Sequence, residues 1–247
     1  MVNIIYAQWL KTRRTPLRMI ILACPVLFSL LLLIYRLMSS TISGKEVESF
    51  FLLFAIVSNF SLSFFIPMLY QPDKEAALYA NELRIGRKRA LLFVSRFALT
   101  VLLFAFMELL AIMTFALGQV FVIKISINLV HVSVLALISF MTVLPLIVFY
   151  QVICLQLNYV GSILFGSFFS LASILLGTTD LGATVWKWLP FVWNIKLLTT
   201  YSNTIHSGGG ETNLYLYLSA AFLLTMIFMF FAILWYNRWS GMTQLEE

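Results

Sequence analysis

The stretch that decides the fold is residues 91–117, LLFVSRFALTVLLFAFMELLAIMTFAL, in which Arg96 and Glu108 are the only charged side chains. This run is longer than the roughly 20 apolar residues that cross a bilayer as a helix. Because the hydrocarbon core contains no water to bind free backbone groups, such a segment must satisfy them internally as a helix. We therefore predict that the lipid bilayer sets the fold.

The rest of the chain has the same character. Hydrophobic residues make up 62% of its 247 positions and charged residues only 11%, whereas soluble domains carry about 25% charged residues. This composition excludes a water-soluble globular domain, and the length leaves no room for a second domain of about 100 residues beside the membrane part. We predict one all-α integral membrane domain over residues 1–247.

The apolar runs predict about six transmembrane helices. They are expected at residues 17–38, 50–70, 91–117, 128–153, 160–177 and 214–236. If the N-terminus is cytoplasmic, eleven of the 16 Lys and Arg residues lie at cytoplasmic ends, which is the distribution that the positive-inside rule favours. Both termini are therefore predicted to be cytoplasmic. The eleven are Lys11, Arg13, Arg14, Arg18, Lys74, Arg84, Arg87, Lys88, Arg89, Arg96 and Arg238.

Three segments outside the spans carry further signals. Residues 3–14 combine apolar side chains with a basic end, which predicts a short helix on the inner membrane surface. The outer loop 178–213 contains Trp186, Trp188 and Trp193 in a run too short to span. Because tryptophan favours the membrane interface, we expect this run to lie in the outer interface or to dip into it.

The third segment is a helix predicted over residues 72–86, between the second and third spans. Pro72 suits a first helical position, and Gly86 suits its end. Apolar side chains recur at i, i+3, i+4 and i+7 and form a narrow stripe. The stripe either rests on the membrane surface or inserts into a groove of a partner protein. Its members are Ala76, Tyr79, Ala80 and Leu83.

Glu108, in the middle of the third span, is the one acid that stands out as a candidate site. A carboxyl group at mid-bilayer is costly and must be neutral, paired or next to a polar cavity. It is either a substrate contact or proton site, or a neutral acid bonded to a neighbouring span. His131 and His206 have no partner at metal-ligand spacing, and no nucleophile–base pair is evident. We expect no enzyme, no bound metal and no cofactor on this chain.

Small residues repeat every fourth position in the fifth span, at Ser162, Gly166 and Ser170. Such a face lets two helices approach closely in a membrane. It packs either within the chain or against a second membrane subunit.

Two short motifs point to a family. Residues 8–15, QWLKTRRT, precede the first span, and residues 82–86, ELRIG, lead through a basic run into the third span. Together with the order of elements, they resemble the ABC-2 type permease fold, and within it the lantibiotic-immunity permeases of the MutG/EpiG and MutE/EpiE type. Ser95 and Arg96 depart from the Pro and Lys that such permeases often have there.

The resemblance implies a permease subunit of an ATP-driven exporter that expels a lantibiotic or similar antimicrobial peptide from the plasma membrane of a Gram-positive bacterium. Its expected partners are an ABC ATPase in two copies, which binds Mg-ATP, a sister permease or second copy of the chain, and membrane lipid, but no nucleic acid. An ion-coupled secondary transporter or channel is the alternative. The implied ATPase-coupling residues are Ala76, Tyr79, Ala80, Glu82, Leu83 and Gly86.

Overall fold

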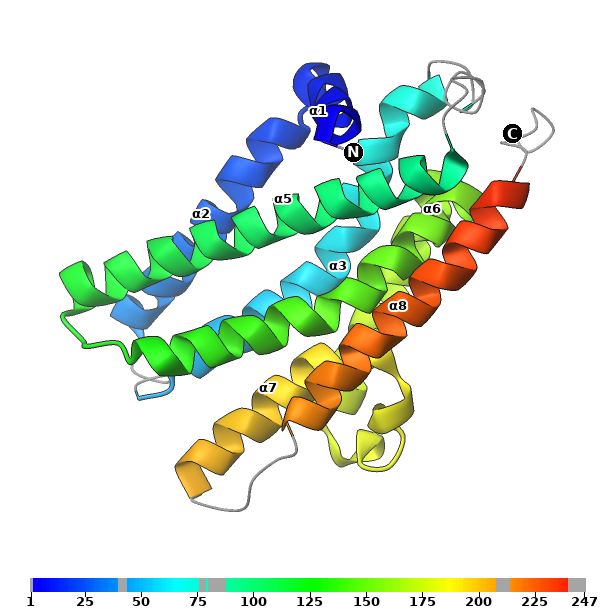
Figure 1. Cartoon of the computed structure of the whole chain (residues 1–247). Coiled ribbons are helices and arrows are strands. Elements are labelled where there is room, and N and C mark those ends of the chain that lie inside the picture. The colour runs from blue at the N-terminus through cyan, green and yellow to red at the C-terminus, as the bar shows by residue number, and fades with distance from the viewer. Residues whose placement is uncertain (1, 40–43, 76–78, 80–87, 208–213, 240–247) are drawn as a thin grey trace.

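The computed structural model describes residues 2–39, 44–75, 79, 88–207 and 214–239 (Figure 1). These residues are helical almost throughout and contain no strand, which confirms the all-α prediction. Within these described ranges, five helices are long and apolar enough to cross a membrane. They are α2 (Leu17–Met38), α3 (Glu46–Glu75), α5 (Arg89–Gly118, continued by a π-helical turn η2 over Gln119–Ile123), α6 (Leu129–Thr178) and α8 (Leu214–Arg238).

The length of α6 explains why the structure has five long helices although about six spans are predicted. Its 50 residues would measure about 75 Å as one straight helix, more than twice the roughly 30 Å of a hydrocarbon core. The backbone of Asn158 leaves the helical region, with φ 60° and ψ −167°. The predicted spans 128–153 and 160–177 lie on either side of this break, so we call residues 129–157 and 159–178 the first and second arms of α6.

The second arm folds back beside α3. The Ser162 hydroxyl donates to the Ser63 carbonyl oxygen over 2.7 Å, while Asn59 Nδ2 donates to Ser173 Oγ over 3.4 Å. Since the residue number rises along α6 as it falls along α3, the two segments are antiparallel. Asn128 caps the start of the first arm, where its side chain accepts from the backbone N–H of Val130 over 3.0 Å.

The helices form two groups joined by aromatic side chains. Helix α2 packs mainly against α5, whereas α3 packs mainly against α6, which also contacts α8. Between the groups, the Phe50 and Phe115 rings stack with centroids 4.3 Å apart, and Phe54 lies 6.2 Å from Phe104. Figure 1 shows α1 (Val2–Lys11), the end of α3, the start of α5 and the C-terminal end of α8 at one end of the bundle, here called the terminal end.

Two predicted segments differ from the structure. Helix α3 continues past Pro67 and Pro72 to Glu75, so no separate helix begins at Pro72. In the predicted outer loop, the 3-10 turns η3 (Asp180–Gly182) and η4 (Trp186–Trp188) precede an 18-residue helix, α7 (Pro190–Ser207). Pro190 stands at the first position of α7, where its missing N–H costs nothing.

Candidate functional site

A cluster of charged side chains, two of the three buried, joins three helices at the terminal end. The Asp73 carboxylate of α3 accepts hydrogen bonds from Lys11 Nζ, at the end of α1, and from Arg96 Nη2 of α5, both at 2.5 Å. Arg96 Nε also donates to Gln8 Oε1 of α1 over 3.3 Å. Because Asp73 is buried and Arg96 is only 4% exposed, these two charges compensate each other, while the Lys11 ammonium reaches Asp73 from the exposed side. We call Lys11, Asp73 and Arg96 the ion cluster.

Aromatic rings extend the ion cluster towards the segment that links α3 to α5. The Arg96 guanidinium lies 4.2 Å from the centre of the Tyr70 ring, a cation–π arrangement. Tyr70 in turn contacts Tyr79, whose ring lies 5.4 Å from that of Trp239, just beyond α8. The Trp239 carbonyl oxygen accepts from Arg89 Nη1, at the start of α5, over 2.7 Å. Both ends of the linking segment are therefore tied to the bundle.

Among the predicted ATPase-coupling residues, the structure describes only Tyr79. Its φ of 70° is left-handed, and its backbone N–H donates to the Asp73 carbonyl oxygen over 3.1 Å. The side chain is 2% exposed, so Tyr79 packs against its own chain rather than forming part of an exposed stripe. The other five, which lie outside the described residues, are Ala76, Ala80, Glu82, Leu83 and Gly86.

Helix α1 is fixed to the bundle by contacts with α2 and α3. The Arg18 guanidinium lies over the Trp9 ring at 4.4 Å and donates from Nη2 to the Trp9 carbonyl oxygen over 2.9 Å. Together with the Lys11–Asp73 ion pair, these contacts hold both the end of α1 and its turn into α2. Movement of α1 is thus linked to α2, α3 and α5.

Glu108 is buried in the contact between α5 and α6. It is 4% exposed and lies beside Ser139 of α6, but its Oε1 atom makes no hydrogen bond to any described residue. In the part of the chain that the structure describes, no basic side chain pairs with it. Glu108 lies twelve residues beyond Arg96 in α5, about 18 Å along the helix axis, so it is not brought together with the ion cluster.

Replacing Glu108 by Gln is expected to leave the folding of the protein unchanged. The amide has the same shape and keeps its place beside Ser139, and no described cation loses a partner. Thermal unfolding in detergent checks this. A clear fall in the unfolding temperature of Glu108→Gln would instead show that the carboxyl group itself stabilises the contact between α5 and α6. Glu108→Lys, which buries an unpaired charge, serves as the damaging comparison.

The small-residue face of α6 packs within the chain, which selects one of its two predicted uses. Ser162, Gly166 and Ser170 of the second arm are buried, and Gly166 lies directly against α3. A β-carbon added at Gly166 would lie 2.1 Å from Ser63 Cβ. The absence of a side chain at this position is therefore what allows the two helices to approach.

Two asparagines that sequence reasoning missed hold α7 against this contact. Asn59 Nδ2 of α3 donates to Ser173 Oγ and also to the Phe191 carbonyl oxygen over 3.2 Å. Asn194 Nδ2 of α7, which is fully buried, donates to Ser58 Oγ over 3.5 Å. An Asn inside an apolar run was the available signal, since polar side chains within spans face other helices rather than lipid.

The three tryptophans of the predicted outer loop differ in their exposure. Trp186 and Trp193 are buried, whereas Trp188 is 84% exposed. Trp193 Nε1 donates to the carbonyl oxygens of Trp186 over 3.0 Å and Lys187 over 3.2 Å, and the Trp186 ring lies 5.0 Å from Tyr217 of α8. Two of the three tryptophans therefore fasten the turn before α7, while the expectation that this run lies in the outer interface or dips into it stays a prediction.

The Trp193→Phe variant is expected to lose about 1 kcal/mol of stability, because Phe cannot donate to the two carbonyl oxygens. The comparison is Trp188→Phe at the exposed position, where we expect no measurable change. Unfolding midpoints of the two proteins in the same detergent test this difference. Equal midpoints would mean that Trp193 does not fasten the turn.

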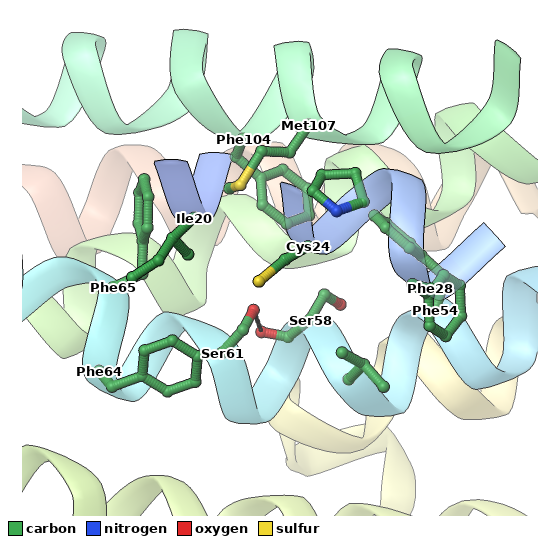
Figure 2. Close-up of a pocket in the computed structure, with 12 residues that line it drawn as sticks. Ile20, Cys24, Phe28, Phe54, Ser58, Ser61, Phe64, Phe65, Phe104 and Met107 are labelled. Carbon is green, nitrogen blue, oxygen red and sulfur yellow. Dashed lines mark hydrogen bonds between the residues drawn. The ribbon is translucent and has the colours of Figure 1, made fainter. Parts of the chain in front are cut away.

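A lateral pocket of about 130 Å³ lies between α2, α3 and α5 (Figure 2). Apolar side chains, including Phe54, Phe65 and Phe104, form most of its wall. Cys24 from α2 and Ser61 from α3 reach towards each other within it (Figure 2). A second, larger and polar hollow lies at the opposite end of the bundle, between the start of α3, the end of α6 and α7.

The described residues contain no group of three or more His, Cys, Asp or Glu side chains that could hold a metal ion. The long apolar helices and the buried polar contacts between them define a multi-pass all-α membrane protein. No family model, curated protein or solved structure matches this chain.

Proposed function

We propose that this chain is the membrane-spanning permease subunit of an ATP-driven exporter, with ATP hydrolysed by a separate ABC ATPase subunit. The observation that supports this most is the ion cluster. It joins α1, the end of α3 and the start of α5, and the last two are the helix ends that residues 76–88 connect along the chain. A push on that segment would therefore reach three helices together.

The transmission has a simple physical basis. Charged hydrogen bonds between buried groups are shorter and stronger than neutral ones, and they keep side chains in one geometry. Helices are rigid, so a displacement of α3 and α5 at their terminal ends carries along their length. Under this proposal Ala76, Ala80, Glu82, Leu83 and Gly86 contact the ATPase, while Tyr79 fixes the segment to the bundle.

The cargo and location follow from the resemblance to lantibiotic-immunity permeases. We propose that the cargo is an amphiphilic antimicrobial peptide already inserted in the plasma membrane of a Gram-positive bacterium, and that the terminal end is cytoplasmic. The complex would contain two ATPase copies and a sister permease or second copy of this chain. An ion-coupled transporter would need several ionisable groups deep in the bilayer, and among the described residues Glu108 alone fits that position.

A photo-cross-linking amino acid placed at Leu83 tests the coupling role. In native membranes we expect it to capture a polypeptide whose peptides contain the G-x-x-x-x-G-K-[S/T] sequence of an ATPase. The matched control carries the same amino acid at Leu129, an exposed position at the opposite end of the bundle, where no ATPase should be captured. Capture at both positions or at neither would contradict the proposal.

A further inference from the structure

The lateral pocket between α2, α3 and α5 has polar atoms in its wall, but these atoms already have partners. Ser58 Oγ donates to the Ala55 carbonyl oxygen over 2.9 Å, and Ser61 Oγ donates to the Ser58 carbonyl oxygen over 3.0 Å. A buried water needs two to four polar partners to be stable. The pocket therefore favours an apolar occupant over water.

The size and rigidity of the pocket also suit an apolar group. A cavity of about 150 Å³ lined by apolar side chains stays dry and binds benzene, and this pocket measures about 130 Å³. Its wall is held by ring contacts, with the Phe28 and Phe54 centroids 5.9 Å apart and Phe54 6.2 Å from Phe104. Left empty, it would forfeit dispersion contacts along its whole lining.

The pocket opens sideways, towards the surface that faces lipid. Val57 is 46% exposed and Cys24 is exposed, and both line it. Cys24 lies six residues along α2 from Arg18, which is about 9 Å along the helix axis. Arg18 and Trp9, stacked together, are residue types that sit at the level of the headgroups. The pocket is therefore at the depth of the middle of an acyl chain.

We propose that this pocket binds one acyl chain of a membrane phospholipid, held between α2 and α3. The chain fills the space where these two helices, which make few direct contacts, would otherwise leave a gap. The basic residues Arg13 and Arg18 near the start of α2 lie at the level where the phosphate of that lipid would be. This lipid site depends only on the membrane-spanning fold and not on the proposed export function.

The test uses the full-length protein in phosphatidylcholine nanodiscs that contain a phosphatidylcholine with a diazirine at the middle of one acyl chain. After illumination, mass spectrometry locates the adducts. We expect pocket residues such as Cys24 and Ser61 to be labelled several-fold more than the lipid-facing Leu223 of α8, because a bound chain stays near them longer.

Filling the pocket gives the matched comparison. Ser61→Phe should reduce labelling of the pocket to the level seen at Leu223, whereas Leu53→Phe, which adds bulk to the exposed face of the same helix outside the pocket, should not. Cys24→Leu narrows the pocket from α2 and should have a smaller effect in the same direction. The proposal is overturned if wild-type pocket residues are labelled no more than Leu223, or if neither pocket substitution reduces their labelling.

Discussion

Replacing Asp73 by Ala is expected to destabilise the protein by about 3–5 kcal/mol, because the buried Arg96 charge loses its carboxylate partner. Asp73 bonds to both Lys11 and Arg96, so one substitution removes both ion pairs and releases α1 from α3. Thermal unfolding in detergent measures the loss. Glu75→Ala is the matched control, since Glu75 is exposed on the last turn of the same helix and should change stability by less than about 0.5 kcal/mol.

A double substitution separates stability from transmission. Asp73→Leu with Arg96→Met replaces the buried charges by apolar side chains, which is often neutral for folding. We expect this protein to recover most of the stability that Asp73→Ala loses, but to export poorly, because α1, α3 and α5 are no longer bonded together. Full export by the double variant would show that the ion cluster holds the fold without transmitting motion. Equal unfolding midpoints for Asp73→Ala and Glu75→Ala would contradict the claim that the ion cluster stabilises the protein.

Replacing Gly166 by Leu is expected to cost about 3 kcal/mol and to reduce the yield of folded protein, because the added side chain overpacks a helix contact. Even a β-carbon would lie 2.1 Å from Ser63 Cβ and 2.2 Å from Ser63 Oγ. The second arm of α6 would have to separate from α3, and the Ser162–Ser63 hydrogen bond would break. Unfolding midpoints and size-exclusion profiles report both effects.

Two comparisons make the Gly166 result specific. Leu164→Phe adds bulk to the same arm at a position that is 64% exposed, and it should be tolerated. Exchanging the small residue across the contact, with Gly166→Ala and Ser63→Gly together, should recover much of the loss that Gly166→Ala causes alone. If Gly166→Leu unfolds at the wild-type temperature, the close α3–α6 contact is incorrect.

Much of the helix pattern could be predicted from residue order alone. The first predicted span, 17–38, has the bounds of α2, and the last, 214–236, ends two residues before α8 does. These limits follow from local hydropathy, because a segment enters the bilayer according to how apolar it is. The break at Asn158 was also anticipated, because two spans were separated there. Local signals were sufficient wherever the bilayer, and not a neighbouring helix, determines the structure.

Local sequence patterns are insufficient where contacts between neighbouring helices determine the structure. Pro72 was predicted to begin a helix, but α3 continues through it to Glu75 with Asp73 paired to two cations. Trp186 and Trp193 are predicted to lie in the outer interface or to dip into it, and the sequence gives no sign that they pack inside the turn before α7. Residue spacing along the chain does not indicate which helices are adjacent. Neither the ion cluster nor the asparagine contacts to α7 could therefore be predicted from it.

The central claim is that a separate ATPase drives this membrane domain through its terminal end. The most direct measurement is purification of the full-length chain from native membranes in mild detergent, followed by an ATP hydrolysis assay and mass spectrometry. If a separate ATPase drives the chain, we expect a preparation that hydrolyses ATP, contains a second polypeptide with a Walker sequence, and loses cargo-stimulated hydrolysis in the Asp73→Leu/Arg96→Met variant. A chain that comes out without any ATPase subunit, and transports its cargo when ATP is absent, would contradict it.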